Sequence, residues 1–128
     1  MYIVVKKFGA GILYSNAFFV SKNMSACIAM ERDGSITMRR NTSIKGLTRR
    51  YSVNSFAKFL GMNLPIRKIG MDKNGIITAF SDFRIQYPLK IEYNTYNFNS
   101  RDIEATLLDD CSFGVYDKIG NMVYRAKF

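Results

Sequence analysis

The sequence predicts an α+β fold: a single antiparallel, hairpin-rich β-sheet domain over residues 1–128, with two short helices packed on it. Three observations lead to this prediction. The length of 128 residues falls within the usual range for one domain. A hydrophobic fraction of 48%, with 14% aromatic residues, is enough for a packed core. Apolar and polar residues alternate on both sides of several turn sequences, which is typical of β-hairpins.

The first elements are two short strands. Residues 2–5 are mostly β-branched and predict a strand, and a second strand is expected within residues 12–20, after a glycine-containing turn. The polar pair Ser15 and Asn16 interrupts this apolar stretch. We therefore expect core strands here rather than a signal peptide.

Three hairpins follow from turn chemistry. The clearest has period-2 segments on both sides of Asp33-Gly34, a pair that tolerates the positive φ angles of a tight turn. The predicted hairpins cover residues 26–38, 66–80 and 111–128. They resemble one another loosely, but their irregular spacing predicts no propeller or solenoid repeat. Alternation also predicts a strand at residues 85–91, and Pro88 places it at a sheet edge because proline donates no backbone N–H.

Two segments have the pattern of short helices. Val53, Ala57 and Leu60 belong to an i, i+3, i+4, i+7 series that also includes Phe56, between a capping Ser52 and a terminating Gly61. A second helix is predicted from Asn99 or Ser100 through Leu108, with Asp102 and Glu104 near its positive end.

The first of these helices also admits a different interpretation. Ala57 and Gly61 have the spacing of a helix-turn-helix motif, in which a second helix would start near Leu64 and present Arg67 and Lys68. The hairpin at residues 72–75 would then resemble the wing of a winged-helix protein. Only about two helical turns fit before that hairpin, so ordinary core packing is the competing interpretation.

The composition excludes several classes of chemistry. The chain has no histidine, which excludes Ser-His-Asp and Cys-His catalysis. Cys27 and Cys111 are isolated, so we expect two buried thiols rather than a zinc site, although a long-range disulfide stays open. Adjacent Asp109 and Asp110 diverge, and no glycine-rich phosphate loop is present. We predict a protein that is not an enzyme, has no cofactor and binds no metal.

The strongest functional signal is the distribution of charge. The net charge is +9, and residues 34–71 contain eight basic residues and no Asp or Glu. The rest of the chain is nearly balanced. Most of the eight are arginines, whose planar guanidinium groups suit phosphate oxygens and base stacking. Residues 41–51 are polar, basic and aperiodic, which predicts a loop with hydroxyl groups and a glycine, as phosphate sites use.

These observations predict a non-enzymatic nucleic-acid-binding protein, with DNA or RNA as partner. The expected phosphate contacts come from the basic residues, and Tyr51 is expected to stack on an unpaired base. The predicted site consists of Arg39, Arg40, Lys45, Arg49, Arg50, Tyr51, Lys58, Arg67 and Lys68.

Four alternatives stay open. The basic face could be a solvated surface, or it could dock on the acidic surface of another protein, as in a small inhibitor or adaptor. The composition is also compatible with a virion structural subunit or another small viral protein. The same arginines could line a pocket for a small anionic nucleotide. No apolar run is long enough to span a membrane, and we expect a cytoplasmic location, in the host cytoplasm if the protein is viral. The oligomeric state is left open by the sequence.

Overall fold

The computed structural model describes residues 2–82, 84–94 and 102–128, and it is built almost entirely of β-strands. Sixteen strands follow one another along the chain: β1 (Ile3–Val5), β2 (Phe8–Gly9), β3 (Leu13–Tyr14), β4 (Ala17–Val20), β5 (Ala26–Met30), β6 (Ile36–Ile44), β7 (Leu47–Ser55), β8 (Ala57–Phe59), β9 (Met62–Leu64), β10 (Ile66–Met71), β11 (Ile77–Ser81), β12 (Gln86–Pro88), β13 (Lys90–Asn94), β14 (Glu104–Leu107), β15 (Phe113–Tyr116) and β16 (Met122–Lys127). The described residues contain no α-helix, so the predicted α+β fold is wrong.

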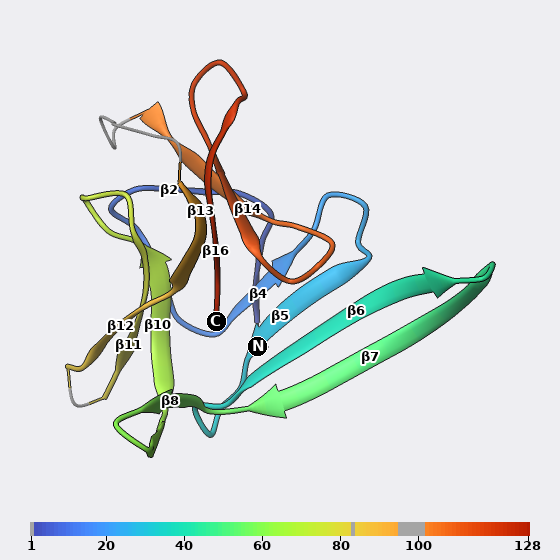
Figure 1. Cartoon of the computed structure of the whole chain (residues 1–128). Helices are drawn as coiled ribbons and strands as arrows, with labels where there is room; N and C mark the ends of the chain where they lie inside the picture. The colour runs from blue at the N-terminus through green and yellow to red at the C-terminus, as the bar shows by residue number, and fades with distance from the viewer. Residues whose placement is uncertain (1, 83, 95–101) are drawn as a thin grey trace.

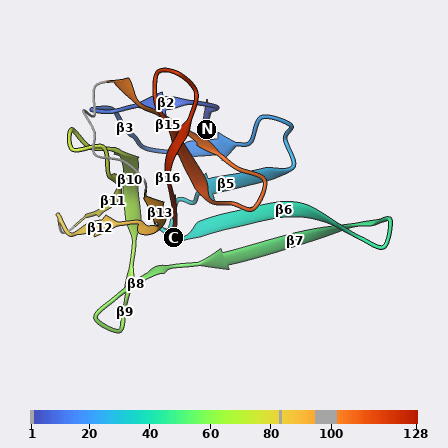
Figure 2. The same ribbon diagram turned by 45° about the horizontal axis from the view of Figure 1, so that its top comes forward.

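Three sheets make up the body of the molecule, and a separate two-stranded hairpin joins two of them (Figures 1 and 2). The strand orders are β1-β4-β5-β6-β7, β12-β11-β10-β3 and β13-β16-β15-β14-β2, and the small hairpin is β8-β9. Each large sheet contains one meander of three consecutive antiparallel strands: β4-β5-β6, β10-β11-β12 or β14-β15-β16. The same unit therefore occurs three times, a repeat that the sequence analysis did not predict.

The turns within the meanders share one geometry. In all six, a residue with positive φ donates its backbone N–H to the carbonyl three positions earlier, over 2.9–3.3 Å. These residues are Met24, Gly34, Gly75, Arg84, Cys111 and Gly120. This bond closes a four-residue turn whose last residue is left-handed, a common connection between antiparallel strands. Since only three of the six are glycines, the repeat is hard to see in the sequence.

The first and second meanders are separated by an insertion. Gly75 and Cys111, which hold equivalent places in the second and third meanders, are 36 positions apart in the numbering. Met24 holds the same place in the first meander and is 51 positions before Gly75. The extra chain contains the outer part of the β6–β7 hairpin and the β8–β9 hairpin, both of which extend from the body in Figure 1.

The N-terminal segment connects the three sheets. β1 pairs with β4 in parallel, β2 pairs with β14, and β3 pairs with β10. Each of these partners is the first strand of its meander. The segment therefore adds one edge strand to every sheet, which joins the three meanders into one unit.

A single hydrophobic core lies where the sheets meet. Phe8, Phe19 and Phe113 come from three different strands, and their ring centroids are 5.3–5.7 Å apart in tilted and edge-to-face contacts. All three are at most 3% exposed. Tyr14 adds an edge-to-face contact at 6.0 Å from Phe8. Aromatic contacts of this kind add stabilisation beyond the area that they bury.

Both predicted helices are replaced by strands. The segment expected to be helical from Ser52 to Gly61 forms the end of β7 and the β8–β9 hairpin. Leu60 and Gly61 have φ angles of 50° and 78°, which close a two-residue hairpin turn instead of a helix. The helix-turn-helix interpretation is wrong for the same reason. In the second segment, residues 104–107 form β14, and Asn99 and Ser100 lie outside the described residues.

The hairpin predictions are confirmed. β5 pairs with β6, β10 with β11, and β15 with β16, all antiparallel, around the predicted turns. The strand predicted at residues 85–91 is divided into β12 and β13, which belong to different sheets. Pro88 lies in β12, an edge strand as predicted, where it faces Thr78 of β11. Cys27 and Cys111 are both free thiols rather than a disulfide, but only Cys111 is buried as predicted, whereas Cys27 is half-buried.

Candidate nucleic-acid interface

The outer part of the β6–β7 hairpin projects from the body as a two-stranded arm (Figures 1 and 2). β5 pairs with β6 as far as Arg40, opposite Ala26, and one more bond joins the N–H of Asn41 to the carbonyl of Ser25 at 2.8 Å. Beyond this point only β7 accompanies β6. We call residues 39–52 the arm; its base, at Arg39 and Arg40, still pairs with β5, and only its outer part is two-stranded. The composition of residues 41–51 predicted a loop, but these residues form a ladder of pairs that continues to Ile44 opposite Leu47, closed by the turn at Lys45 and Gly46.

The tip of the arm is a two-residue turn. Lys45 and Gly46 have φ angles of 51° and 78°, both positive, as the favoured hairpin turns require. Nothing lies within 4 Å of the place that a Cβ on Gly46 would occupy, so the turn is free of contacts at this position. The hairpin was missed because Lys-Gly is not one of the pairs typical of such turns. Beyond the apolar pair Ile44 and Leu47, most residues of the two strands are polar and show no hydrophobic alternation.

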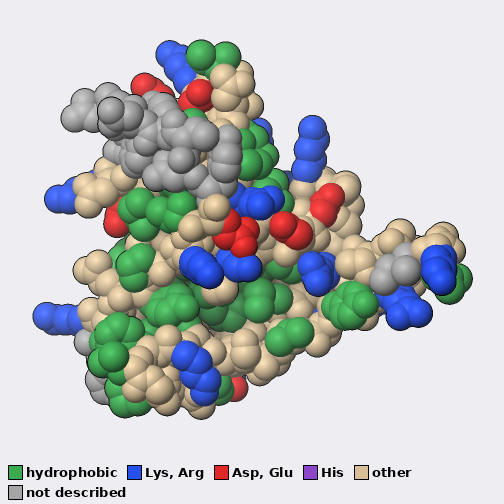
Figure 3. All heavy atoms as spheres, viewed as in Figure 1, with side chains coloured by type: hydrophobic (Ala, Val, Ile, Leu, Met, Phe, Trp, Pro, Cys, Tyr) green, Lys and Arg blue, Asp and Glu red, His purple; other side chains and the backbone are tan. Residues whose placement is uncertain are grey.

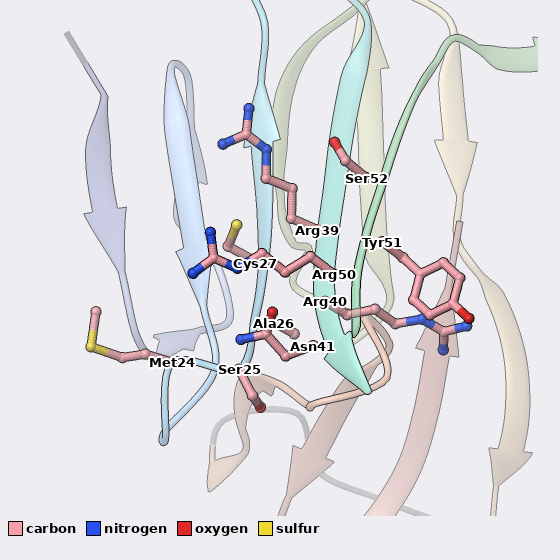
Figure 4. A pocket seen from close by; sticks show the side chains of 10 residues that line it. All are labelled: Met24, Ser25, Ala26, Cys27, Arg39, Arg40, Asn41, Arg50, Tyr51 and Ser52. Carbon is pink, nitrogen blue, oxygen red and sulfur yellow. The ribbon is translucent and has the colours of Figure 1, made fainter. Parts of the chain in front are cut away.

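The register of the arm sorts its side chains onto two faces. Directly opposed residues of an antiparallel pair share a face, and successive residues alternate. One face, which we call the polar face, has three opposed pairs: Arg39 with Ser52, Asn41 with Arg50, and Ser43 with Thr48. The other, which we call the tyrosine face, contains Arg40 opposite Tyr51 and Thr42 opposite Arg49. In Figure 4, Arg39 and Arg50 extend to one side of the ribbon and Arg40 and Tyr51 to the other.

The cations of the arm have no acidic partners. Arg39, Arg40, Lys45, Arg49 and Arg50 are all exposed, and none of them forms an ion pair within the described part of the chain. The segment has no Asp or Glu of its own. In Figure 3, blue side chains cluster at the end of the projecting arm, whereas the red ones lie over the body. The result is a projecting surface with five uncompensated positive charges.

On the tyrosine face, one of these arginines packs on an aromatic ring. The guanidinium carbon of Arg40 lies 5.6 Å from the centroid of the Tyr51 ring, within the range of a cation–π interaction. Tyr51 is 42% exposed. The ring that was predicted to stack on a base is therefore already in contact with a guanidinium group, although much of it remains accessible.

The other three predicted cations lie off the arm. Arg67, on β10, bonds to Asp82 at 2.9 Å and to the carbonyl of Arg32 at 2.6 Å. Lys58, on β8, bonds to Asn63 across the small hairpin. These contacts give both residues a structural role. Lys68 is exposed on β10, in a different sheet from the arm. The structure thus brings six of the nine predicted residues together and separates the other three from them.

A shallow hollow of about 510 Å³ lies at the base of the arm. It is lined by residues of the arm and by Met24, Ser25 and Cys27 (Figure 4). Burial raises the pKa of the Cys27 thiol, which keeps it protonated and weakly nucleophilic. The hollow therefore offers cationic and hydrogen-bonding groups but no activated nucleophile.

Within the described ranges, no three His, Cys, Asp or Glu side chains are grouped so that they could hold a metal ion. The described segments also contain no helix with the length and apolar character needed to cross a membrane.

Comparison of this chain with protein-family models, with curated proteins and with solved structures finds no match.

Proposed function

We propose that the protein is a non-enzymatic nucleic-acid-binding protein that contacts phosphate groups through the arm. The observation that carries this proposal is the combination of position and charge: five cations project on one ribbon, and none of them forms an ion pair with a described carboxylate. Such a surface attracts a polyanion over a distance of about one Debye length, roughly 10 Å at 0.1 M salt.

The side chains suit phosphate groups in particular. Four of the five cations are arginines, whose forked donors match two phosphate oxygens at once. No carboxylate in the described part of the chain pairs with their guanidinium groups, so binding breaks no ion pair among these residues. The hydroxyls of Ser43, Thr48 and Ser52 lie along the same ribbon and can add neutral hydrogen bonds to the backbone of a nucleic acid.

The arm also has the features of a part added to a scaffold. Its outer part belongs to the insertion between the first two meanders, and its described side chains lie outside the hydrophobic core. Binding residues often lie on such segments, because a rigid body positions them without depending on them for its own stability.

Charge reversal on the arm tests this proposal. We expect Arg49→Glu/Arg50→Glu to abolish measurable binding to labelled DNA and RNA in fluorescence anisotropy at low salt. A matched variant, Lys7→Glu/Lys118→Glu, makes the same change in net charge at two exposed residues away from the arm and should bind within a few-fold of the wild type. Equal loss in both variants would show that net charge alone governs binding. Unchanged binding in the arm variant would exclude the arm as the site.

One observation favours a second candidate. β7 is the edge of its sheet, and its outer backbone groups have no strand partner within the described chain. An acidic protein segment could add to this edge as a further strand. Arg49 and Arg50 on this edge would discourage unspecific strand pairing and favour an acidic partner. A stoichiometric protein recovered after nuclease treatment, with no intrinsic binding to nucleic acid, would support this candidate instead.

A further inference from the structure

We propose that the arm enters the major groove of duplex DNA with its polar face toward the base edges. This inference rests on the proposed function and specifies the class of nucleic acid, the groove and the face. It follows from three properties of the arm: the unengaged polar side chains, the side of the sheet on which they lie, and the thickness of a two-stranded ribbon.

The polar face consists entirely of hydrogen-bonding side chains that are not used within the protein. From Arg39 to Ser52, none of its six side chains forms a hydrogen bond to another described residue. The next pair toward the body behaves differently, because Asn54 donates to Ser35 at 2.9 Å and to Thr37 at 2.8 Å. The polar side chains of this face therefore form hydrogen bonds next to the body, whereas those of the arm form none to other described residues.

Both faces of the arm are exposed, but the polar face is the one directed away from the body. The tyrosine face continues the face of β6 that carries Ile36 and Met38, and Ile36 is 2% exposed and belongs to the core. The tyrosine face is thus directed to the same side as the body. The polar face is directed to the opposite side, so a long rod-shaped ligand can lie along it without meeting the other two sheets.

The size of the ribbon selects the groove. The major groove of B-form DNA is about 12 Å wide and about 8.5 Å deep and admits a two-stranded β-ribbon, whereas the minor groove is only about 6 Å wide. The major groove of A-form RNA is too narrow for side chains to reach the bases. The outer part of the arm is a ribbon of two strands, about 4.8 Å apart, and therefore fits duplex DNA but not duplex RNA. Arg39 and Ser52 lie at the base of this ribbon, where β5 also pairs with β6.

The types and spacing of the side chains agree with base contacts. Arginine pairs with guanine O6 and N7, and asparagine pairs with adenine N6 and N7. Arg39, Asn41 and Ser43 follow one another at every second position of β6, about 6.8 Å apart, which is close to two base-pair steps. Arg50 lies opposite Asn41, so the two strands present adjacent donors to neighbouring bases.

Three measurements test the inference. The first compares affinity for duplex DNA, duplex RNA of the same sequence and single-stranded DNA at one salt concentration, and we expect duplex DNA to bind about tenfold more tightly than either of the others. The second adds netropsin, which occupies the minor groove and should not displace the protein. Equal or better binding to RNA or single strands, or displacement by netropsin, would overturn the inference and leave the proposed function intact.

The third measurement compares two variants with the same loss of charge. Arg39→Gln/Arg50→Gln removes the arginines of the polar face, and Arg40→Gln/Arg49→Gln removes those of the tyrosine face. We expect the first to lose at least about tenfold more affinity for duplex DNA than the second. Equal losses would show that the polar face does not read the groove. Absence of binding to all three nucleic acids by the wild type would instead refute the proposed function itself.

Discussion

Truncation of the arm should separate binding from folding. The variant lacks residues 42–49 and joins Asn41 to Arg50 through an Asn-Gly turn, which suits a two-residue hairpin. This change removes two of the five cations of the arm, Lys45 and Arg49. The described side chains of the deleted segment lie outside the hydrophobic core. We therefore expect weaker binding with unchanged stability.

The expected effect on binding can be worked out from counterion release. If each of the five cations neutralises one phosphate of duplex DNA, the logarithm of the affinity falls with the logarithm of the salt concentration with a slope of about −4.5, and with three cations the slope is about −2.7. Between about 50 and 200 mM salt, the affinity of the wild type should fall about 500-fold and that of the truncated variant about 40-fold. Fluorescence anisotropy with a labelled duplex measures both slopes.

The expected effect on stability is small. Changes at exposed sites outside the core usually alter the free energy of unfolding by less than about 0.5 kcal/mol, and a shorter connection costs slightly less entropy to close. Thermal unfolding followed by circular dichroism should therefore give a Tm within about 3 °C of the wild type. If the wild type and the truncated variant had the same salt slope, the role of the arm in binding would be refuted. A Tm lower by about 5 °C or more would refute its independence from the core.

Three further predictions concern the scaffold. Phe113→Ala removes a ring that is 0% exposed and should lower the free energy of unfolding by about 3–5 kcal/mol in urea titrations. Phe59 is 36% exposed, so Phe59→Ala should lower this free energy far less. Similar losses in the two variants would contradict the placement of the core. Gly34→Ala should lower Tm much more than Gly46→Ala. Both positions have positive φ, but only the new Cβ at Gly34 would meet an atom of Pro65, at 2.4 Å. A larger loss of Tm in Gly46→Ala would refute this packing. The hydrogen bond from Ser35 lowers the pKa of Asp33, so its stabilising contribution should be present above about pH 4 and be lost as the pH falls through the folded-state pKa. Asp33→Asn should accordingly lower Tm at neutral pH and leave it unchanged in strong acid, and an equal deficit at both would contradict the assignment.

The hairpins were predictable because their determinants are local. Asp33-Gly34, the residues at 72–75 and those at 117–121 combine turn-forming side chains with alternation on both sides, and each forms the expected turn. The repetition of the meander was hidden because Met24, Arg84 and Cys111 take a left-handed conformation in which glycine is usual. At these three positions the tertiary structure imposes a positive φ that the residue type does not predict.

The two helix predictions failed for different reasons. The apolar series from Val53 to Leu60 has helical spacing, but both of these residues are exposed, at 52% and 84%, so the pattern does not mark a buried face. In the second segment the strand signal was present. Ile103, Ala105 and Leu107 are buried and alternate with more exposed residues, a period of two rather than 3.6.

The distribution of charge singled out the segment that contains the arm, but the expected secondary structure of this segment, a loop, was wrong. Residues 34–71, which contain no Asp or Glu, include the arm, and most residues of this exposed ribbon are polar. That the arm binds nucleic acid is a prediction. Because exposed strands do not need an apolar face, the segment has no hydrophobic alternation, and its sequence therefore resembled that of a loop. Arg67 was included with the site because a sequence does not reveal that Asp82 is its neighbour.

The most direct test of the central claim is an anisotropy titration of the wild-type protein with labelled duplex DNA at about 50 and 200 mM salt, the range in which counterion release has a large effect. We expect tight binding at the lower concentration and a loss of affinity of at least about 100-fold at the higher one. An absence of binding at the lower concentration would contradict the claim that the arm is a nucleic-acid interface.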